Sequence, residues 1–462
     1  MNRMAQTHCL PLPRGGEGRG EGSHPEPTHD LRAQPLSLTL SPVGERETLI
    51  TFVLVAVVLL AFPAHAQLRF STYLSEVGKT NPALTAQRAT LPLADAQTII
   101  ARVFPDPVLT AGLASLDVSN VGAQNNVTAS VTVPFEWPGK RSARITFSEA
   151  NRSVAGAEFE DFARLVRAQA AHAYIDAVFA RRVVEQKRAA VESLHKVVGL
   201  NEKRLQEGAA SEIVVLQARV EARRFEGELV TALGEAHALR LLLEEQMGQA
   251  VATRTTLADV AELDLEPRTF EVEALVAGAL ERRPDQHART LAIDAAHAQL
   301  GLARANRGPD VSVGLGWLHY TPGTGAYAAP AYETVSALLS APLPFSKLYD
   351  GEVRSAAAQQ QLAAAQREAN SLRIETEVRT ALIRYEAARE RLAQFDQALL
   401  GDSDRLLEMA RYSFEQGASR LVELLSAQRS WIDLHLAYES ARADHAHALV
   451  ALQTAAGVWT LQ

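Results

Sequence analysis

The residues that could bind a metal ion are few and scattered in this chain of 462 residues. His445 and His447 are two positions apart, which on a helix directs their side chains to different faces. His435 lies on a neighbouring turn only roughly, so no ligand set forms. Cys9 is the single cysteine, and this excludes a disulfide framework and a cysteine-based metal site. We predict no bound metal and no cofactor.

Charged residues that could act in catalysis are also not arranged for it. The sequence has no nucleophile beside a base, no paired catalytic acids and no glycine loop for phosphate. Glu244 with Glu245, and Arg181 with Arg182, are interpreted as solvated or capping positions on helices. The net charge is −8, which gives no basic surface for nucleic acid. The sequence predicts neither an enzyme nor a nucleic-acid-binding protein. The order of its expected helices and strands is the better indicator of its function.

An apolar segment near the start of the chain indicates export. Residues 49–62 read LITFVLVAVVLLAF and are followed by PAHA. A membrane-spanning helix needs roughly 20 apolar residues, so we predict a cleaved signal peptide at 48–66, with the cut between Ala66 and Gln67. The Gly/Pro-rich residues 1–47 are expected to be a disordered leader or sequence upstream of the true start.

The remainder of the chain repeats one pattern twice, over 67–260 and 261–462. Each half opens on a proline that begins a leading helix, Pro82 or Pro284, and continues through two strand-like segments to a very long helix. A glycine interrupts that helix, at Gly208 or Gly417, before a return helix. The expected strands are at about 107–117, 125–135, 310–318 and 333–341, and the expected long helices at about 139–207, 211–247, 352–416 and 419–456.

The strands alternate apolar and small polar residues, as in the second one, where Val127, Ala129, Val131 and Val133 share one face. This pattern suits the lipid-facing wall of a membrane sheet, although a soluble sheet has the same alternation. A membrane sheet leaves no open edge. Four strands are too few for a barrel, so several copies must pool them, with two giving eight strands and three giving twelve.

The long helices predict a duct. Apolar and small residues recur at spacings of three and four along 159–205 and 374–399, which is a coiled-coil seam. A helix over 139–207 is roughly 100 Å long at ~1.5 Å per residue. Such a helix does not fit within a compact globule, whereas it fits a tunnel across the periplasm. A coiled coil without a channel is the alternative.

Two short motifs and the duplication resemble the TolC family of outer-membrane efflux proteins over about 81–457. The motifs are RLQEG at 204–208, and FEQGAS at 414–419 with LVELLSAQR following at 421–429. The resemblance implies a mainly α fold with a small membrane β part, assembled as a homotrimer. Its twelve-stranded β-barrel lies in outer-membrane lipid, and its coiled-coil tunnel lies in the periplasm.

The resemblance also implies partners and site residues. A periplasmic adaptor and an inner-membrane transporter of the RND type are the expected partners. The hairpin tips expected to dock the adaptor are Arg204, Leu205, Gly208, Gly417, Ala418 and Ser419. Glu423 matches a position where acidic residues ring the periplasmic mouth, and Arg420 lies near that of a gating arginine. The alternatives are a plain helix C-cap for the glycines and a solvated face for Glu423.

The expected function is therefore the outer-membrane channel of a tripartite efflux system, a passive conduit and not an enzyme. The turn FEWPGKR at 135–141 is similar to that of the CzcC-like heavy-metal branch, which points to metal cations as cargo. One alternative is the outer-membrane duct of type I secretion, and another is a secreted coiled-coil interaction protein.

Overall fold

A computed structural model describes residues 68–116, 124–248, 260–261, 263, 265–322, 330–343 and 349–459. All of them belong to one of the chain's two compact units, His65–Gln462. The predicted signal peptide and its cleavage site at Ala66 and Gln67 lie outside the described residues. Within the described ranges, no helix combines the length and apolar character needed to cross a bilayer.

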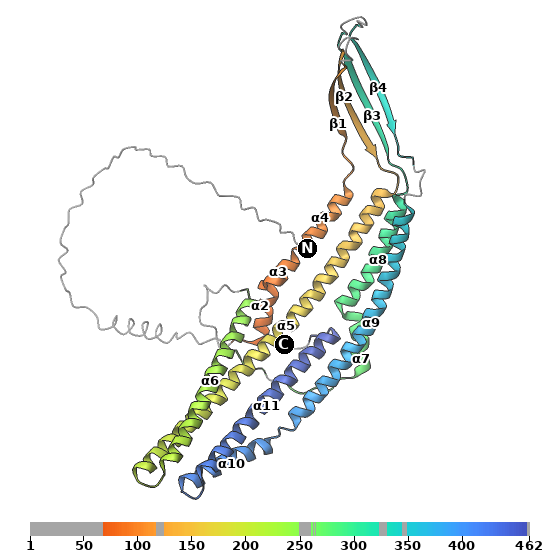
Figure 1. The fold of residues 1–462 in the computed structure, drawn as a ribbon. Coiled ribbons are helices and arrows are strands. Elements are labelled where there is room, and N and C mark those ends of the chain that lie inside the picture. The colour runs from red at the N-terminus through yellow and green to blue at the C-terminus, as the bar shows by residue number, and fades with distance from the viewer. Residues whose placement is uncertain are drawn as a thin grey trace, which may run out of the picture. The chain divides into compact units, whose positions relative to one another are not determined.

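Both halves run in the order of leading helices, two strands and a long helical hairpin (Figure 1). The first half contains α2 (Phe70–Thr80), α3 (Pro82–Arg88), α4 (Thr90–Arg102), β1 (Val108–Leu116), β2 (Gln124–Phe135), α5 (Lys140–Gln206) and α6 (Glu212–Gln246). The second contains α7 (Val272–Arg282), α8 (Pro284–Ala305), β3 (Val311–Tyr320), β4 (Tyr332–Ser340), α9 (Asp350–Ala393), α10 (Gln397–Glu415) and α11 (Leu421–Ala456). The strands lie beyond one end of the helices, and the α5–α6 and α10–α11 turns lie at the other.

The second long helix differs from its expected course over about 352–416, because it is broken between α9 and α10. Asp396 has an extended backbone there, and its carboxylate accepts a hydrogen bond from the Leu399 N–H at 2.7 Å. A side-chain cap of this kind starts a new helix, since it satisfies an amide that would otherwise need a preceding turn. The matching helix α5 is continuous over 67 residues.

The four strands form one antiparallel sheet in the order β1-β2-β3-β4. The central pairing of β2 with β3 joins the two halves, with Val131 opposite Leu315. The outer strands β1 and β4 each pair on one side only among the described residues. The sheet therefore presents two open edges.

The helices pack around small residues. Ala170 and Ala171 of α5 and Ala218 of α6 are completely buried, which lets neighbouring helix backbones approach closely. Tyr174 of α5 and Tyr385 of α9 are completely buried in the largest apolar cluster. This cluster lies where α5, α9 and α11 meet, so the core joins the two halves.

Each return helix ends against the start of a leading helix. In the first half, the Asn81 side chain donates to the Gln246 carbonyl at 2.9 Å, just before Pro82. In the second half, Arg283 precedes Pro284, and its guanidinium donates to the Ala455 carbonyl at 3.1 Å. These side chains satisfy carbonyl groups that the last turn of a helix leaves unpaired.

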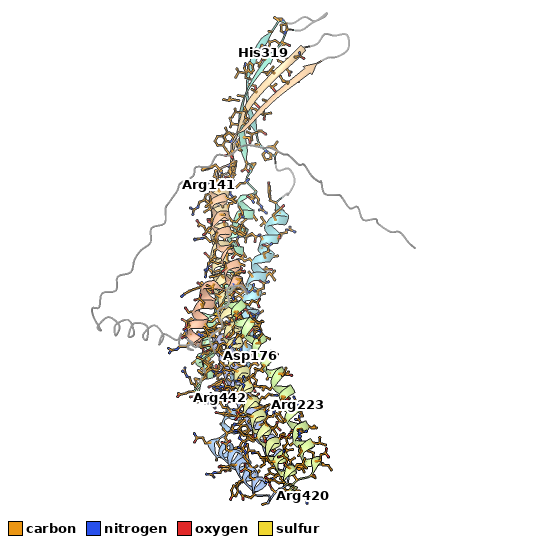
Figure 2. All side chains as sticks on the ribbon, turned by 90° about the vertical axis from the view of Figure 1, so that its left-hand side faces the viewer. Arg141, Asp176, Arg223, His319, Arg420 and Arg442 are labelled. Carbon is orange, nitrogen blue, oxygen red and sulfur yellow. The ribbon has the colours of Figure 1, made fainter. Side chains whose placement is uncertain are left out.

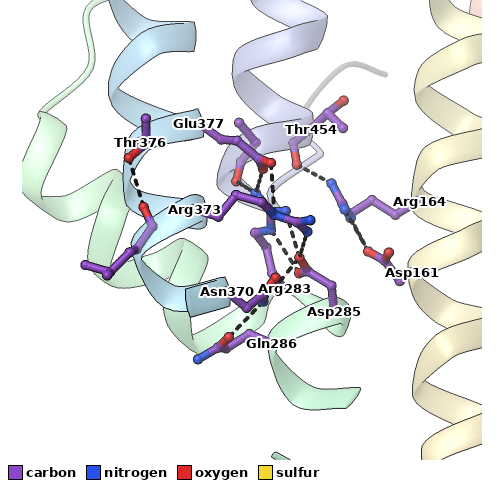
Figure 3. A network of polar contacts seen from close by, with 12 residues as sticks. Asp161, Arg164, Arg283, Asp285, Gln286, Asn370, Arg373, Thr376, Glu377 and Thr454 are labelled. Carbon is purple, nitrogen blue, oxygen red and sulfur yellow. Dashed lines mark hydrogen bonds and ion pairs between the residues drawn. The ribbon is translucent and has the colours of Figure 1, made fainter. Parts of the chain in front are cut away.

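Arg283 is also the centre of a buried ionic network (Figure 3). Its side chain is 2% exposed and forms a two-pronged ion pair with Asp285, at 3.0 and 2.9 Å, and a bond to Glu377 at 2.7 Å. Asn370 of α9 donates to Gln286 at 2.9 Å beside them. The network fixes α8 to α9 and to the end of α11.

We expect Arg283→Met to lower the free energy of unfolding by about 3–5 kcal/mol, because it removes the buried, two-pronged partner of the Asp285 carboxylate and leaves that carboxylate only the longer contacts. Thermal unfolding of the purified protein in detergent measures the effect. Arg373→Met is the matched control, since Arg373 contacts the same carboxylate at 3.3 Å but is 59% exposed. Equal losses in the two variants would contradict the central role of Arg283.

Candidate functional site

The two glycine turns at the ends of the hairpins have the same backbone. Gly208 and Gly417 both have φ of +74°, a left-handed conformation that favours glycine. In each turn the residue after the glycine donates to a carbonyl five positions back, Ala209 to Arg204 at 2.7 Å and Ala418 to Ser413 at 2.9 Å. Both turns are therefore helix C-caps, whatever further function they have.

Arg204 connects the two turns to each other. Its Nη2 donates to the carbonyls of Phe414 and Glu415 at 2.8 and 2.6 Å, and its guanidinium lies 4.9 Å from the centre of the Phe414 ring. An apolar cluster that contains Phe414 and Leu421 packs below this contact. The side chain predicted to dock a partner is thus engaged within the chain, and it holds the second turn against the first.

The other residues predicted at the tips differ in accessibility. Leu205, Gly208, Gly417 and Ala418 are exposed. Ser419 is half-buried, and its hydroxyl has no hydrogen-bond partner among the described residues. The accessible part of the predicted docking surface is therefore the two backbone turns, together with the exposed Leu205 side chain in the last turn of α5.

The predicted gate residues lie at the start of α11. Figure 2 places Arg420 at the end of the helices opposite His319 of the sheet. Arg420 and Glu423 are both exposed, and neither forms an ion pair within the described part of the chain. Glu423 is in the first turn of α11, where the helix dipole favours a negative charge. This dipole accounts for the residue locally and leaves its carboxylate free to act.

Ion pairs between the two hairpins were not foreseen from the sequence. Arg429 of α11 binds both carboxylate oxygens of Glu221 in α6, at 2.8 and 2.6 Å. Arg182 of α5 pairs with Glu439 of α11 at 2.7 Å. The interpretation of Arg182 as solvated is wrong, because its pairing with Glu439 lets it be buried. No local pattern connects partners more than 200 positions apart.

The junction between sheet and helices is built from the 135–141 turn. The Trp137 ring covers Gly308, where an added Cβ would lie 2.2 Å from the ring. Its backbone N–H donates to Asp310 at 2.8 Å, and Lys140 pairs with the same carboxylate at 2.8 Å. Arg141 donates two hydrogen bonds to the last carbonyl of α4. The turn thus fixes elements from both halves to α5.

The residues predicted to face lipid share one face of the sheet, because alternate residues of a strand point to the same side. Their direct partners on the neighbouring strands share that face. Ala129 is opposite Ala111 and Trp317, and Val133 is opposite Val313. Further members are highly exposed, Leu113 at 84% and Val335 at 78%. The opposite face carries mainly small and hydroxyl side chains such as Thr128, Ser130, Thr132, Gly314 and Ser336, together with Leu318 and Leu338. The first face is thus apolar over most of the four strands, with the His319–Glu333 pair as its charged exception beside Val127.

Histidine and acidic residues do not gather into a metal site in the described ranges. His445 and His447 point to different neighbours, Tyr385 and His172, as their spacing predicted. Glu244 was interpreted as surface or cap, but it is 4% exposed, because the end of α6 packs into the main core.

Known proteins are similar to this chain along most of its length. The family model for outer membrane efflux proteins matches residues 73–249 and 275–458. The cobalt-zinc-cadmium resistance protein CzcC of Cupriavidus metallidurans is 25% identical over 379 residues, which cover 82% of this chain and 87% of CzcC. Protein CyaE of Bordetella pertussis is 27% identical over 393 residues, covering 80% and 81%. The two ranges matched by the family model include the strands as well as the helices.

A solved structure has the same fold. The CmeC outer membrane channel of Campylobacter jejuni superposes with a TM-score of 0.68 at 17% identity, over 84% of this chain and 85% of CmeC.

We expect Arg204→Met to open the second turn about tenfold more often, the scale of losing a charge-assisted hydrogen bond. Hydrogen exchange of the amides at 414–420 measures this opening. Arg223→Met is the control, because Arg223 is 83% exposed and its ion pair with Glu226 is three residues away on the same helix. Unchanged exchange in the Arg204 variant would show that the two turns are held together by the apolar cluster alone.

Proposed function

The chain belongs to the outer membrane efflux protein family, and we propose that three copies of it form one exit duct for metal cations. It is an outer-membrane efflux channel component and not an enzyme. Channels of this family are trimers that work with adaptors and inner-membrane pumps. In the proposed assembly the pump, of the RND type, supplies the energy, and this chain supplies the passage.

The open-edged sheet with one apolar face carries the proposal. Edge strands β1 and β4 have unpaired backbone groups, and such groups are costly in lipid unless another strand pairs with them. Pairing β4 of one copy with β1 of the next satisfies both edges. Three copies then give twelve strands, with Val127, Ala129, Val131 and Val133 facing lipid and the hydroxyl face lining the passage.

The helices support the same assembly. Ile213 and Val220 of α6 are 66% and 68% exposed, and Met409 and Tyr412 of α10 are 61% and 64% exposed. Contiguous exposed apolar surface on a helix marks an interface. We place the α10 surface of one copy against the α6 surface of the next, which covers both and continues the ring below the sheet.

The hairpin turns are the proposed adaptor surface, formed by Gly208, Gly417, Ala418, Ser419 and Leu205. The turns lie at the end of the helices away from the sheet, where a periplasmic partner has access. Arg204 positions them as one surface and is not itself a free docking side chain.

Metal cations are the proposed cargo on two grounds. CzcC, a cobalt-zinc-cadmium resistance protein, is similar over most of this chain, and the 135–141 turn is similar to that of the same branch. Type I secretion is the second candidate.

Deleting the gene from its host is expected to raise sensitivity to Co²⁺, Zn²⁺ and Cd²⁺, and the wild-type gene is expected to restore growth. Growth curves over a range of metal and drug concentrations measure the profile. Sensitivity to drugs alone would overturn the metal assignment while leaving the efflux channel in place, and loss of one secreted protein would favour type I secretion.

Glu423→Gln is expected to weaken block of the channel by divalent cations, because three carboxylates around the mouth attract cations. Conductance in planar bilayers, with the half-blocking concentration rising several-fold, is the measurement. Glu212→Gln is the control, since Glu212 is the acidic residue in the first turn of the other return helix, α6. Identical block in the wild type and the Glu423 variant would remove Glu423 from the gate.

A further inference from the structure

Two histidines of α11 contact different neighbours where this helix packs between α5 and α9. His447 lies against His172 of α5, with 2.7 Å between their Nδ1 atoms and ring centres 5.0 Å apart. His445 is 1% exposed and packs on the Tyr385 ring of α9 at 5.3 Å. One helix thus meets both of its neighbours through imidazole rings, which change charge near neutral pH.

The His172–His447 contact tolerates only one proton between the two rings. At 2.7 Å one Nδ1 must donate and the other must accept. The Nε2 atom of His447 is 2.9 Å from the Asp176 carboxylate, which can only accept, so this Nε2 carries a proton and donates. The two Nδ1 atoms then share one proton. A second proton between them removes the hydrogen bond and places two N–H groups in contact.

The groups that face His172 do not stabilise such a charge. Burial and the neighbouring His447 lower the pKa of His172, and Asp176 opposes them only in part. On α9, Arg384 lines the same groove of about 830 Å³. Two carboxylates in that groove are already paired, Asp161 with Arg164 at 2.7 Å and Glu377 of α9 with Arg283 at 2.7 Å. The remaining carboxylate near a protonated His172, Asp176, is already bonded to His447.

His445 has no acceptor for an added proton. Its Nε2 is buried and has no hydrogen-bond partner among the described residues. Burial lowers its pKa, and the positive charge of Arg389 on α9 lowers it further. The nearby acid of α11, Asp444, is paired with Arg391 of α9. Protonation thus creates an uncompensated buried charge on the α9 side of α11.

We propose that His172, His445 and His447 form an acid-sensitive joint that holds α11 between α5 and α9 at neutral pH and releases it on acidification. The sign follows from linkage. His172 and His445 have native pKa values below the ordinary 6.5, so the opened state binds more protons below that pH. The joint keeps its full stability above about pH 6.5 and loses it as the pH falls.

Helix α11 connects the joint to the hairpin turns at the far end of the helices. Helix α11 is uninterrupted from Leu421 to Ala456, so His445, His447 and Glu423 lie on one helix. Loss of the histidine contacts at 445–447 removes one of the restraints on the position of the Glu423 end. Acid in the periplasm would then favour a change at the mouth without a partner protein.

The test is hydrogen exchange of the full protein in detergent, corrected for intrinsic rates, between pH 7.5 and 5.5. We expect opening of the α11 amides at 440–452 to rise with acid, by up to about tenfold per pH unit for each extra proton bound. His172→Gln keeps a hydrogen-bonding partner for His447 without titrating, and His445→Phe keeps the ring contact with Tyr385. Each variant should show a shallower pH dependence.

His297→Gln is the control, because His297 is exposed on α8, and its pH dependence should equal that of the wild type. His447→Gln gives a second removal of the pair if one variant fails to fold. The proposal is overturned if wild-type opening does not change with pH, or if the joint variants keep the wild-type slope. The exchange readout does not depend on transport, so it is independent of the cargo assignment.

Discussion

The carbonyl groups at the ends of the two return helices, α6 and α11, need hydrogen-bond donors. The packing of each half depends on the side chains that supply these donors. In the first half Asn81 and Thr80 satisfy the end of α6, the latter at 2.7 Å from the Met247 carbonyl. In the second, Arg283 and Arg164 satisfy the end of α11, with Arg164 donating to Thr454 at 2.8 Å. These contacts join the last element of each hairpin to helices far away along the chain, so they set where the hairpins end.

The local periodicity of apolar residues, together with proline and glycine at helix boundaries, predicted much of this fold. Prolines at 82 and 284 begin the leading helices, glycines at 208 and 417 follow the ends of α5 and α10, and period-two alternation predicted which face of β2 is apolar. Family membership confirms the resemblance that the two motifs indicated. Each of these signals acts within a few residues, which is the range that a single sequence reports.

Contacts between distant segments were beyond that range. The break at Asp396 depends on one side-chain cap, which competes with a helix pattern that continues through it. The bonds from Arg204 to the second turn, and from Arg429 to Glu221, join segments whose distance in space is set by packing. His172 and His447 likewise gave no signal, because a histidine pairs in the same way with a neighbour from any part of the chain.

The two turns share a backbone but not their chemistry, since Ser413 occupies in the second hairpin the place that Arg204 has in the first. Arg204 donates to the second turn, and among the described residues no side chain of the second turn donates to the first. In a ring of three copies, six hairpin tips would therefore alternate between two kinds. Partner subunits seated on successive tips would meet the same backbone turn with different flanking side chains, so contacts to the backbone could repeat sixfold while contacts to the side chains could repeat only threefold.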